Sequence, residues 1–119
     1  RRIVIKNNTL TQHLPMEKSR CTGIFLGHFD AAIIRSNDIS ATGDDGEGDE
    51  RTGAGIWSAG RRGRQLLIDG NSIWGYRYSI VAEPRSPGPG PKTFRWFIAH
   101  NSTSGWISHA SDVHLYVPK

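Results

Sequence analysis

The chain has 119 residues, of which 36% are hydrophobic and 22% charged, and its formal net charge is +4. This length suits one domain, and the lack of any apolar run of about 18 residues excludes a membrane-spanning helix. The single cysteine, Cys21, excludes an internal disulfide and a cysteine-based zinc site. We therefore expect a single domain over residues 1–119.

Short segments with the pattern of β-strands recur along the chain. Most alternate apolar and polar residues, whereas residues 31–36 are assigned from the β-branched pair Ile33-Ile34, with one short helix as the alternative there. In chain order they are RRIVIK, residues 31–36, GIWSA, RQLLID, SIWGYRYSIVA, KTFRWFIAH and DVHLYVPK. Such period-two patterns are typical of strands, and no long segment keeps a helical period. Asp69-Gly70 between two apolar runs predicts a tight hairpin. The sequence therefore predicts an all-β fold: a single small antiparallel β-sandwich or barrel of about six to eight short strands, without an internal repeat.

Three segments lack this alternation. Residues 10–22 are irregular, and residues 37–55 are rich in Gly and acidic residues, which predicts a flexible acidic loop. Residues 83–92, with the sequence EPRSPGPGP at their core, predict a Pro/Gly connector because proline lacks a backbone donor.

The acidic loop raises the question of calcium. Asp45, Glu47 and Asp49 alternate, as calcium ligands often do, but Ile56 stands where the calcium-loop pattern has its final Glu. We therefore expect no cofactor, with calcium at the acidic loop as a weaker alternative.

The charge of the chain is unevenly distributed. Residues 38–50 hold six of the eleven acidic residues, whereas the rest of the chain carries all 15 Lys and Arg. Such a basic surface attracts anionic partners, including acidic glycans, anionic lipids and nucleic acids.

Arginine and tryptophan residues are the candidate ligand-binding groups. Guanidinium groups bind anions, and exposed aromatic rings stack on flat ligands. Trp74 and Trp96 fit the role of core anchors, whereas Trp57 and Trp106 lie in Gly-rich surroundings, and we expect at least one of them to be partly exposed. The predicted ligand-binding residues are Trp57, Arg61, Arg62, Arg64, Arg77 and Trp106.

The histidines near the C-terminus suggest a different chemistry. His100, His109 and His114 could hold zinc, as in a small metallohydrolase, but no metal-binding or nucleophile motif surrounds them. We therefore predict no metal site and no catalytic residues.

Two stretches resemble known families. RRGRQLLIDGNSIWGYRY followed by KTFRWFIAH, from Arg61 to His100, resembles the FLYWCH zinc-finger module. Ile98 stands where that family has a zinc-binding Cys, and a second Cys is missing, so the resemblance implies a degenerate, zinc-free module that binds nucleic acid. The opening RIVIKNNT is similar to the first strand of aegerolysin-like and other small β-sandwich cytolysins and lectins.

These features together predict a non-enzymatic, lectin-like binding module whose loop Arg and Trp residues bind an extracellular glycan or an anionic membrane surface. The sequence leaves the compartment open and slightly favours secretion. The alternatives are a nucleic-acid-binding module and a structural or capsid-like β-sandwich subunit, and homo-oligomers are possible for either class.

Overall fold

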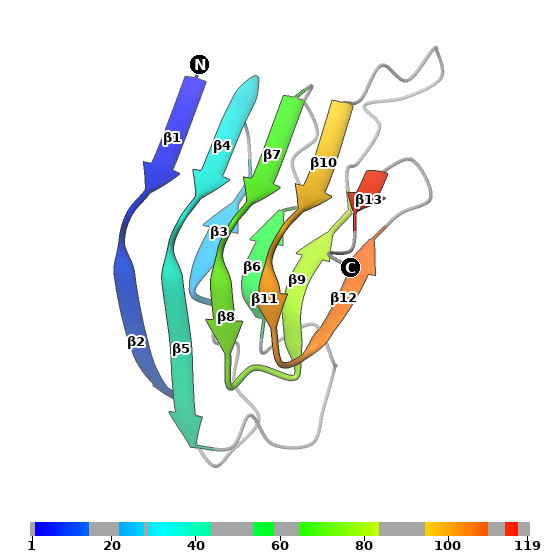
Figure 1. Ribbon diagram of the computed structural model, residues 1–119. Coiled ribbons are helices and arrows are strands. Elements are labelled where there is room, and N and C mark those ends of the chain that lie inside the picture. Colours follow the sequence, from blue (N-terminus) through cyan, green and yellow to red (C-terminus); the bar gives the residue numbers. More distant parts are fainter. Residues whose placement is uncertain are drawn as a thin grey trace.

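The computed structural model describes residues 2–14, 22–27, 29–43, 54–58, 65–83, 95–109 and 114–116. Within these ranges every regular element is a β-strand, which confirms the all-β prediction (Figure 1). The described residues include no helix that is long and apolar enough to cross a membrane.

The strands form three sheets, and every pair of described strands is parallel. The first sheet contains, in spatial order, β1 (Arg2–Lys6), β4 (Ala31–Arg35), β7 (Gln65–Asp69), β10 (Arg95–Ala99) and β13 (His114–Tyr116). The second contains β2 (Thr9–Leu14), β5 (Asp38–Gly43), β8 (Ser72–Trp74) and β11 (Ser102–Thr103). The third contains β3 (Ile24–Leu26), β6 (Ala54–Ser58), β9 (Tyr78–Ala82) and β12 (Trp106–His109).

The chain visits the three sheets in a fixed order, so each turn of the coil places one strand on each sheet (Figure 1). A strand therefore pairs with the strand one full turn later, and both run in the same direction. This arrangement is a parallel β-helix, and the predicted antiparallel sandwich or barrel is wrong. The β-sandwich premise of the capsid-like alternative is wrong for the same reason. Alternation of apolar and polar residues indicates which face of a strand is buried, but not which strand lies beside it.

The same backbone bend recurs where the first sheet passes into the second. Asn7, Ser36, Gly70 and His100 have φ angles of 59°, 57°, 67° and 58°, and each is followed by an asparagine. These residues occupy the left-handed region, which Gly and Asn adopt most readily. At Asp69-Gly70 the bend directs the chain from β7 into β8 of another sheet, so the predicted hairpin is wrong.

The asparagines that follow these bends form a ladder, which we call the Asn ladder: Asn8, Asn37, Asn71 and Asn101. They are 29, 34 and 30 residues apart, so the expectation of no internal repeat is also wrong. The uneven spacing hides the repeat in the sequence, because segments of different length lie between the strands.

Each step of the Asn ladder uses the same hydrogen bonds. The backbone N–H and the side-chain Nδ2 of Asn37 both donate to Oδ1 of Asn71, each at 2.9 Å. Asn71 donates to Oδ1 of Asn101 in the same way, again at 2.9 Å. Nδ2 of Asn71 also donates to the carbonyl of Ile34 at 3.0 Å. At the bend, buried backbone groups lose their hydrogen-bond partners in the sheet, and the asparagine side-chain amide takes the place of those partners.

The core consists of side chains that stack on their equivalents in the next turn. Paired registers align Ile34 with Ile68 and Ile98 on the first sheet, and each is at most 1% exposed. Trp96 is fully buried, as predicted, and its ring centroid lies 5.7 Å from that of Phe29. Parallel strands in register align equivalent positions of successive turns, and where these positions are all isoleucine the branched side chains pack densely on one another.

Several segments differ from the sequence-based expectation. The predicted loop at 37–55 begins with strand β5, whose Ile39 is fully buried, and residues 44–53 lie outside the described residues. The irregular segment 10–22 begins within strand β2. The long strand expected in SIWGYRYSIVA is divided at Gly75, which has a φ of 90°. Most of the Pro/Gly connector, from residue 84 on, lies outside the described residues.

Asn71 provides a direct test of the Asn ladder. Asn71→Ala leaves the N–H groups of Asn37 and the Ile34 carbonyl without their partner, and it removes one of the two donors to Oδ1 of Asn101, because the backbone N–H of residue 71 remains. We expect the free energy of unfolding in urea to fall by about 3 kcal/mol or more, because unsatisfied buried polar groups are costly. Asn8→Ala is the matched control, since Asn8 is exposed at the end of the ladder, and it should cost less than about 1 kcal/mol. Equal losses for the two variants would contradict this role of the ladder.

Candidate functional site

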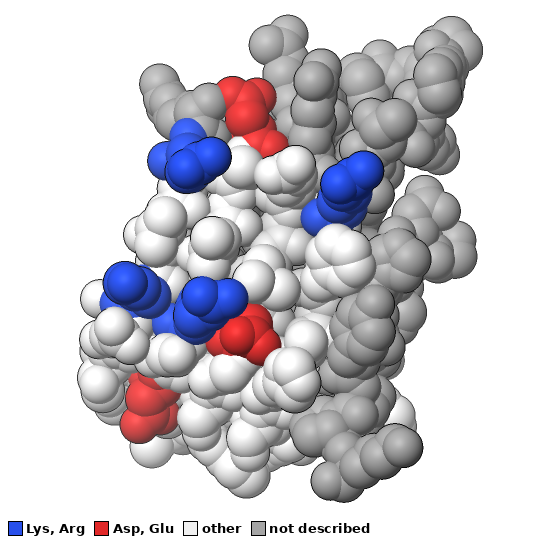
Figure 2. Space-filling view, turned by 45° about the horizontal axis from the view of Figure 1, so that its top comes forward, with Lys and Arg blue, Asp and Glu red and all other residues white. Residues whose placement is uncertain are grey.

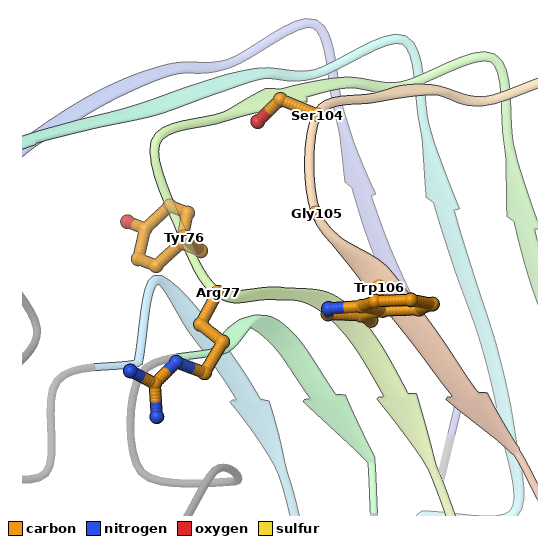
Figure 3. Close-up of a pocket in the computed structure, with 5 residues that line it drawn as sticks. All are labelled: Tyr76, Arg77, Ser104, Gly105 and Trp106. Carbon is orange, nitrogen blue, oxygen red and sulfur yellow. The ribbon is translucent and has the colours of Figure 1, made fainter. Parts of the chain in front are cut away.

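The candidate site lies where the second sheet passes into the third. In two successive turns of the coil this connection is short: residues 75–77 join β8 to β9, and residues 104–105 join β11 to β12. Between these two connections the surface is hollowed to about 550 Å³ (Figure 3). We call this feature the hollow, and its lining residues are Tyr76, Arg77, Ser104, Gly105 and Trp106.

Two glycines allow the connections to approach the chain this closely. A Cβ on Gly75 would lie 2.0 Å from the Ala41 carbonyl oxygen, and one on Gly105 would lie 2.3 Å from the Tyr76 carbonyl oxygen. Both distances are far below van der Waals contact, so only glycine fits at either position.

Hydrogen bonds join the two connections to each other. The Gly75 N–H donates to Oγ of Ser104 at 3.1 Å, and the Gly105 N–H donates to Oγ of Ser79 at 3.0 Å. The Trp106 N–H donates to the Arg77 carbonyl at 2.9 Å. The walls of the hollow are therefore held by backbone contacts and do not depend on the positions of long side chains.

Trp106 and Tyr76 form the aromatic walls of the hollow (Figure 3). The Trp106 side chain is 72% exposed, whereas Tyr76 is only 3% exposed and its hydroxyl donates to Oε1 of Gln12 at 2.8 Å. Arg77 is exposed at the rim, and its guanidinium extends away from the Trp106 ring (Figure 3). The hollow thus combines a broad apolar ring with a cation at one edge.

The structure brings together two of the predicted ligand-binding residues, Arg77 and Trp106. Trp57 lies elsewhere, on β6, where it packs edge-on against Phe25 with ring centroids 5.6 Å apart. Neither Trp57 nor Phe25 is among the residues that line the hollow. Both tryptophans lie on strands, although the prediction placed the binding residues in loops. Arg61, Arg62 and Arg64 lie outside the described residues.

The expected exposure pattern of the tryptophans is correct in part. Trp106 is exposed and Trp57 is partly exposed, as predicted. Trp74, which we expected in the core, is 47% exposed on β8 and donates from Nε1 to Oγ of Ser72 at 2.6 Å. Sequence reasoning also missed Tyr76, Ser104 and Gly105; the glycine directly before Trp106 was the signal that could have found the last two.

The described residues offer no cluster of side chains that could bind a metal ion. They contain no group of three or more His, Cys, Asp or Glu side chains that could hold one. His100 contacts Oδ1 of Asp69 through Nδ1 at 2.9 Å, and Arg35 contacts Oδ2 of the same carboxylate at 3.3 Å. The side chains of His109 and His114, and the acidic residues from 44 to 50, lie outside the described part of the chain.

Comparison with known proteins identifies no relative of this chain: no family model matches it, and neither a curated protein nor a solved structure matches it significantly. The resemblances to the FLYWCH module and to small β-sandwich proteins therefore gain no support. The function is accordingly argued from the geometry of the hollow.

The two glycines with positive φ allow a matched test of the close approach at the hollow. Gly70→Ala, at a φ of 67°, places a Cβ at an ordinary contact distance of 3.9 Å from Oγ of Ser36, whereas Gly75→Ala, at a φ of 90°, places it against the Ala41 carbonyl. We expect Gly70→Ala to lower the free energy of unfolding by about 1 kcal/mol, through backbone strain alone. Gly75→Ala should cost at least about 2 kcal/mol more, because the backbone must also move away. Equal values in urea unfolding would contradict the steric argument.

Proposed function

We propose that the protein is a non-enzymatic binding module that holds an acidic glycan in the hollow. The observation that carries this proposal is the 72% exposed Trp106 ring, which forms one wall of the hollow with Arg77 at its rim. A tryptophan exposed to this degree offers a flat apolar surface, and its rigid ring loses less conformational freedom on binding than a long flexible side chain would.

The chemistry of a sugar ring complements this surface. The C–H groups on one side of a pyranose form an apolar patch that stacks on an indole, while its hydroxyl groups remain in water at the edge. The volume of about 550 Å³ lies within the range of small-molecule sites, roughly 300 to 1,000 Å³. The opening toward solvent is compatible with one or two rings of a longer polymer.

Arg77 favours an acidic glycan over a neutral one. Its planar guanidinium donates two parallel hydrogen bonds to a carboxylate or sulfate, which gives both affinity and orientation. The side chain is exposed at the rim of the hollow, where an acidic group at the outer edge of the bound glycan would contact it. The net charge of +4 attracts such a ligand from a distance.

The polar groups that line the hollow favour a role in binding over a role in catalysis. The Tyr76 hydroxyl is engaged with Gln12, and the Ser104 hydroxyl accepts a hydrogen bond from the Gly75 N–H. None of the described residues that line the hollow is Asp, Glu or His, the side chains that most often transfer protons in hydrolysis or elimination.

The proposal predicts that Trp106→Ala weakens binding of acidic oligosaccharides at least about tenfold, since a central aromatic contact contributes more than 1 kcal/mol. Heparin and oligogalacturonate fragments, with cellohexaose as a neutral probe, can be titrated by calorimetry. Arg77→Gln should weaken binding of the acidic probes and leave that of cellohexaose unchanged.

Trp74→Ala is the matched control, because Trp74 is also exposed but lies outside the hollow. Its affinity for the probes should equal that of the unmodified protein. The proposal is wrong if neither acidic probe binds or if the two tryptophan variants lose affinity equally. Stronger binding of single-stranded DNA than of all three oligosaccharides would favour the nucleic-acid alternative.

A further inference from the structure

The outer face of the first sheet carries an apolar row that crosses four strands. Register pairs Val4 with Ile33, Ile33 with Leu67, and Leu67 with Phe97. Val4 is 53% exposed and the other three are partly exposed, although side chains on this face point away from the core. We call these four residues the apolar row. It extends for about 14 Å across the strands, given a spacing of about 4.8 Å between neighbours.

Basic side chains flank the apolar row on both sides. Arg2 and Arg95 are exposed two residues before Val4 and Phe97, and Lys6 and Arg35 are exposed two residues after Val4 and Ile33. Among the described residues of these strands the only acid is Asp69, which is 24% exposed and contacts Arg35 and His100. Figure 2 shows Lys and Arg side chains above and below an uncharged area on this face, with Asp or Glu side chains beside them at both ends.

We infer that this face docks on an anionic lipid bilayer, with the apolar row at the boundary between headgroups and acyl chains and with Arg2, Lys6 and Arg95 on lipid phosphates, while Arg35 is paired with Asp69. A surface with an apolar centre and cationic margins has the chemistry of a peripheral membrane-binding face. This inference involves residues apart from the hollow and stands independently of the proposed glycan binding.

The sheet geometry argues against a bound peptide strand. β4, β7 and β10 each have a hydrogen-bonded neighbour on both sides, so a strand could be added only at the ends of the described sheet, beside β1 or β13. A strand added there would extend the sheet sideways and would leave the apolar row uncovered. The face therefore offers only side chains to a partner, and these side chains form a broad surface.

Charge and polarity argue against two other occupants. A second copy docked face to face would bring the cations of both chains together, which disfavours that arrangement. A glycan would contact the cations, but it would leave most of the apolar row, including the exposed Val4, in contact with water. A bilayer supplies an apolar phase and a plane of anions together.

The inference is tested with the full chain and vesicles in a co-sedimentation assay. The protein should bind vesicles containing roughly one-third phosphatidylserine in phosphatidylcholine, and it should bind pure phosphatidylcholine much more weakly. Arg2→Gln with Arg95→Gln should lower the partition coefficient about thirtyfold, since each charge near an anionic surface contributes about a fivefold change.

The apolar contribution needs a separate variant, since charge alone would produce salt-sensitive adsorption. Val4→Ser with Ile33→Thr keeps all charges and should lower partitioning about tenfold. Urea unfolding verifies that each variant is folded, and Val4→Ser alone at the exposed position serves if the double variant is unstable. Trp106→Ala should partition like the unmodified protein, which separates this result from the glycan experiment.

The inference is overturned if the anionic vesicles are not bound, or if Val4→Ser variants bind them as tightly as the unmodified protein does. It is also overturned if Trp106→Ala loses vesicle binding to the same extent as the double arginine variant, because the hollow would then be the membrane contact.

Discussion

The hydrogen bonding of one asparagine side chain to the next along the Asn ladder is the interaction on which the rest of the structure depends. At the bend between the first and second sheets the backbone leaves its sheet hydrogen bonds, and the buried Asn37 and Asn71 amides supply the missing partners. Each amide satisfies the turn beside it, so the turns of the coil must lie in register. That register in turn aligns the isoleucine rows of the core, because the strands begin at equivalent bends.

A coil with fixed register determines where functional groups can lie. Its core positions are occupied by stacked aliphatic side chains, so variation is confined to the outer faces and to the connections between sheets. Where the connection between the second and third sheets is short, glycines at 75 and 105 bring backbone against backbone and leave the hollow open beside Trp106. The exposure of Trp106 thus follows from the length of two connections as much as from its own position.

The two surfaces differ in the chemistry they offer. In the hollow, one large ring projects beside one cation, which suits a ligand with a small apolar face and an acidic group. On the first sheet, four aliphatic and aromatic side chains lie between two pairs of cations, which suits an extended apolar phase with an anionic boundary. The hollow lies at a corner of the coil and the apolar row on an outer sheet face, so both can be occupied at once.

The sequence by itself determined the all-β character, the burial of Trp96 and the exposure of at least one of Trp57 and Trp106, and it named Arg77 as a candidate; it predicted fewer strands than the thirteen described. These properties depend on neighbouring residues: alternation marks a strand, and glycine beside a tryptophan marks an open backbone. Only the tertiary structure decided that the strands are parallel and that Asn8, Asn37, Asn71 and Asn101 form one ladder. The tertiary structure alone places Arg77 and Trp106 at the same hollow and aligns Val4 with Phe97 across the first sheet. Those relations link residues about thirty positions apart through pairing between successive turns, and uneven connections between the strands remove the regular period that would have revealed them.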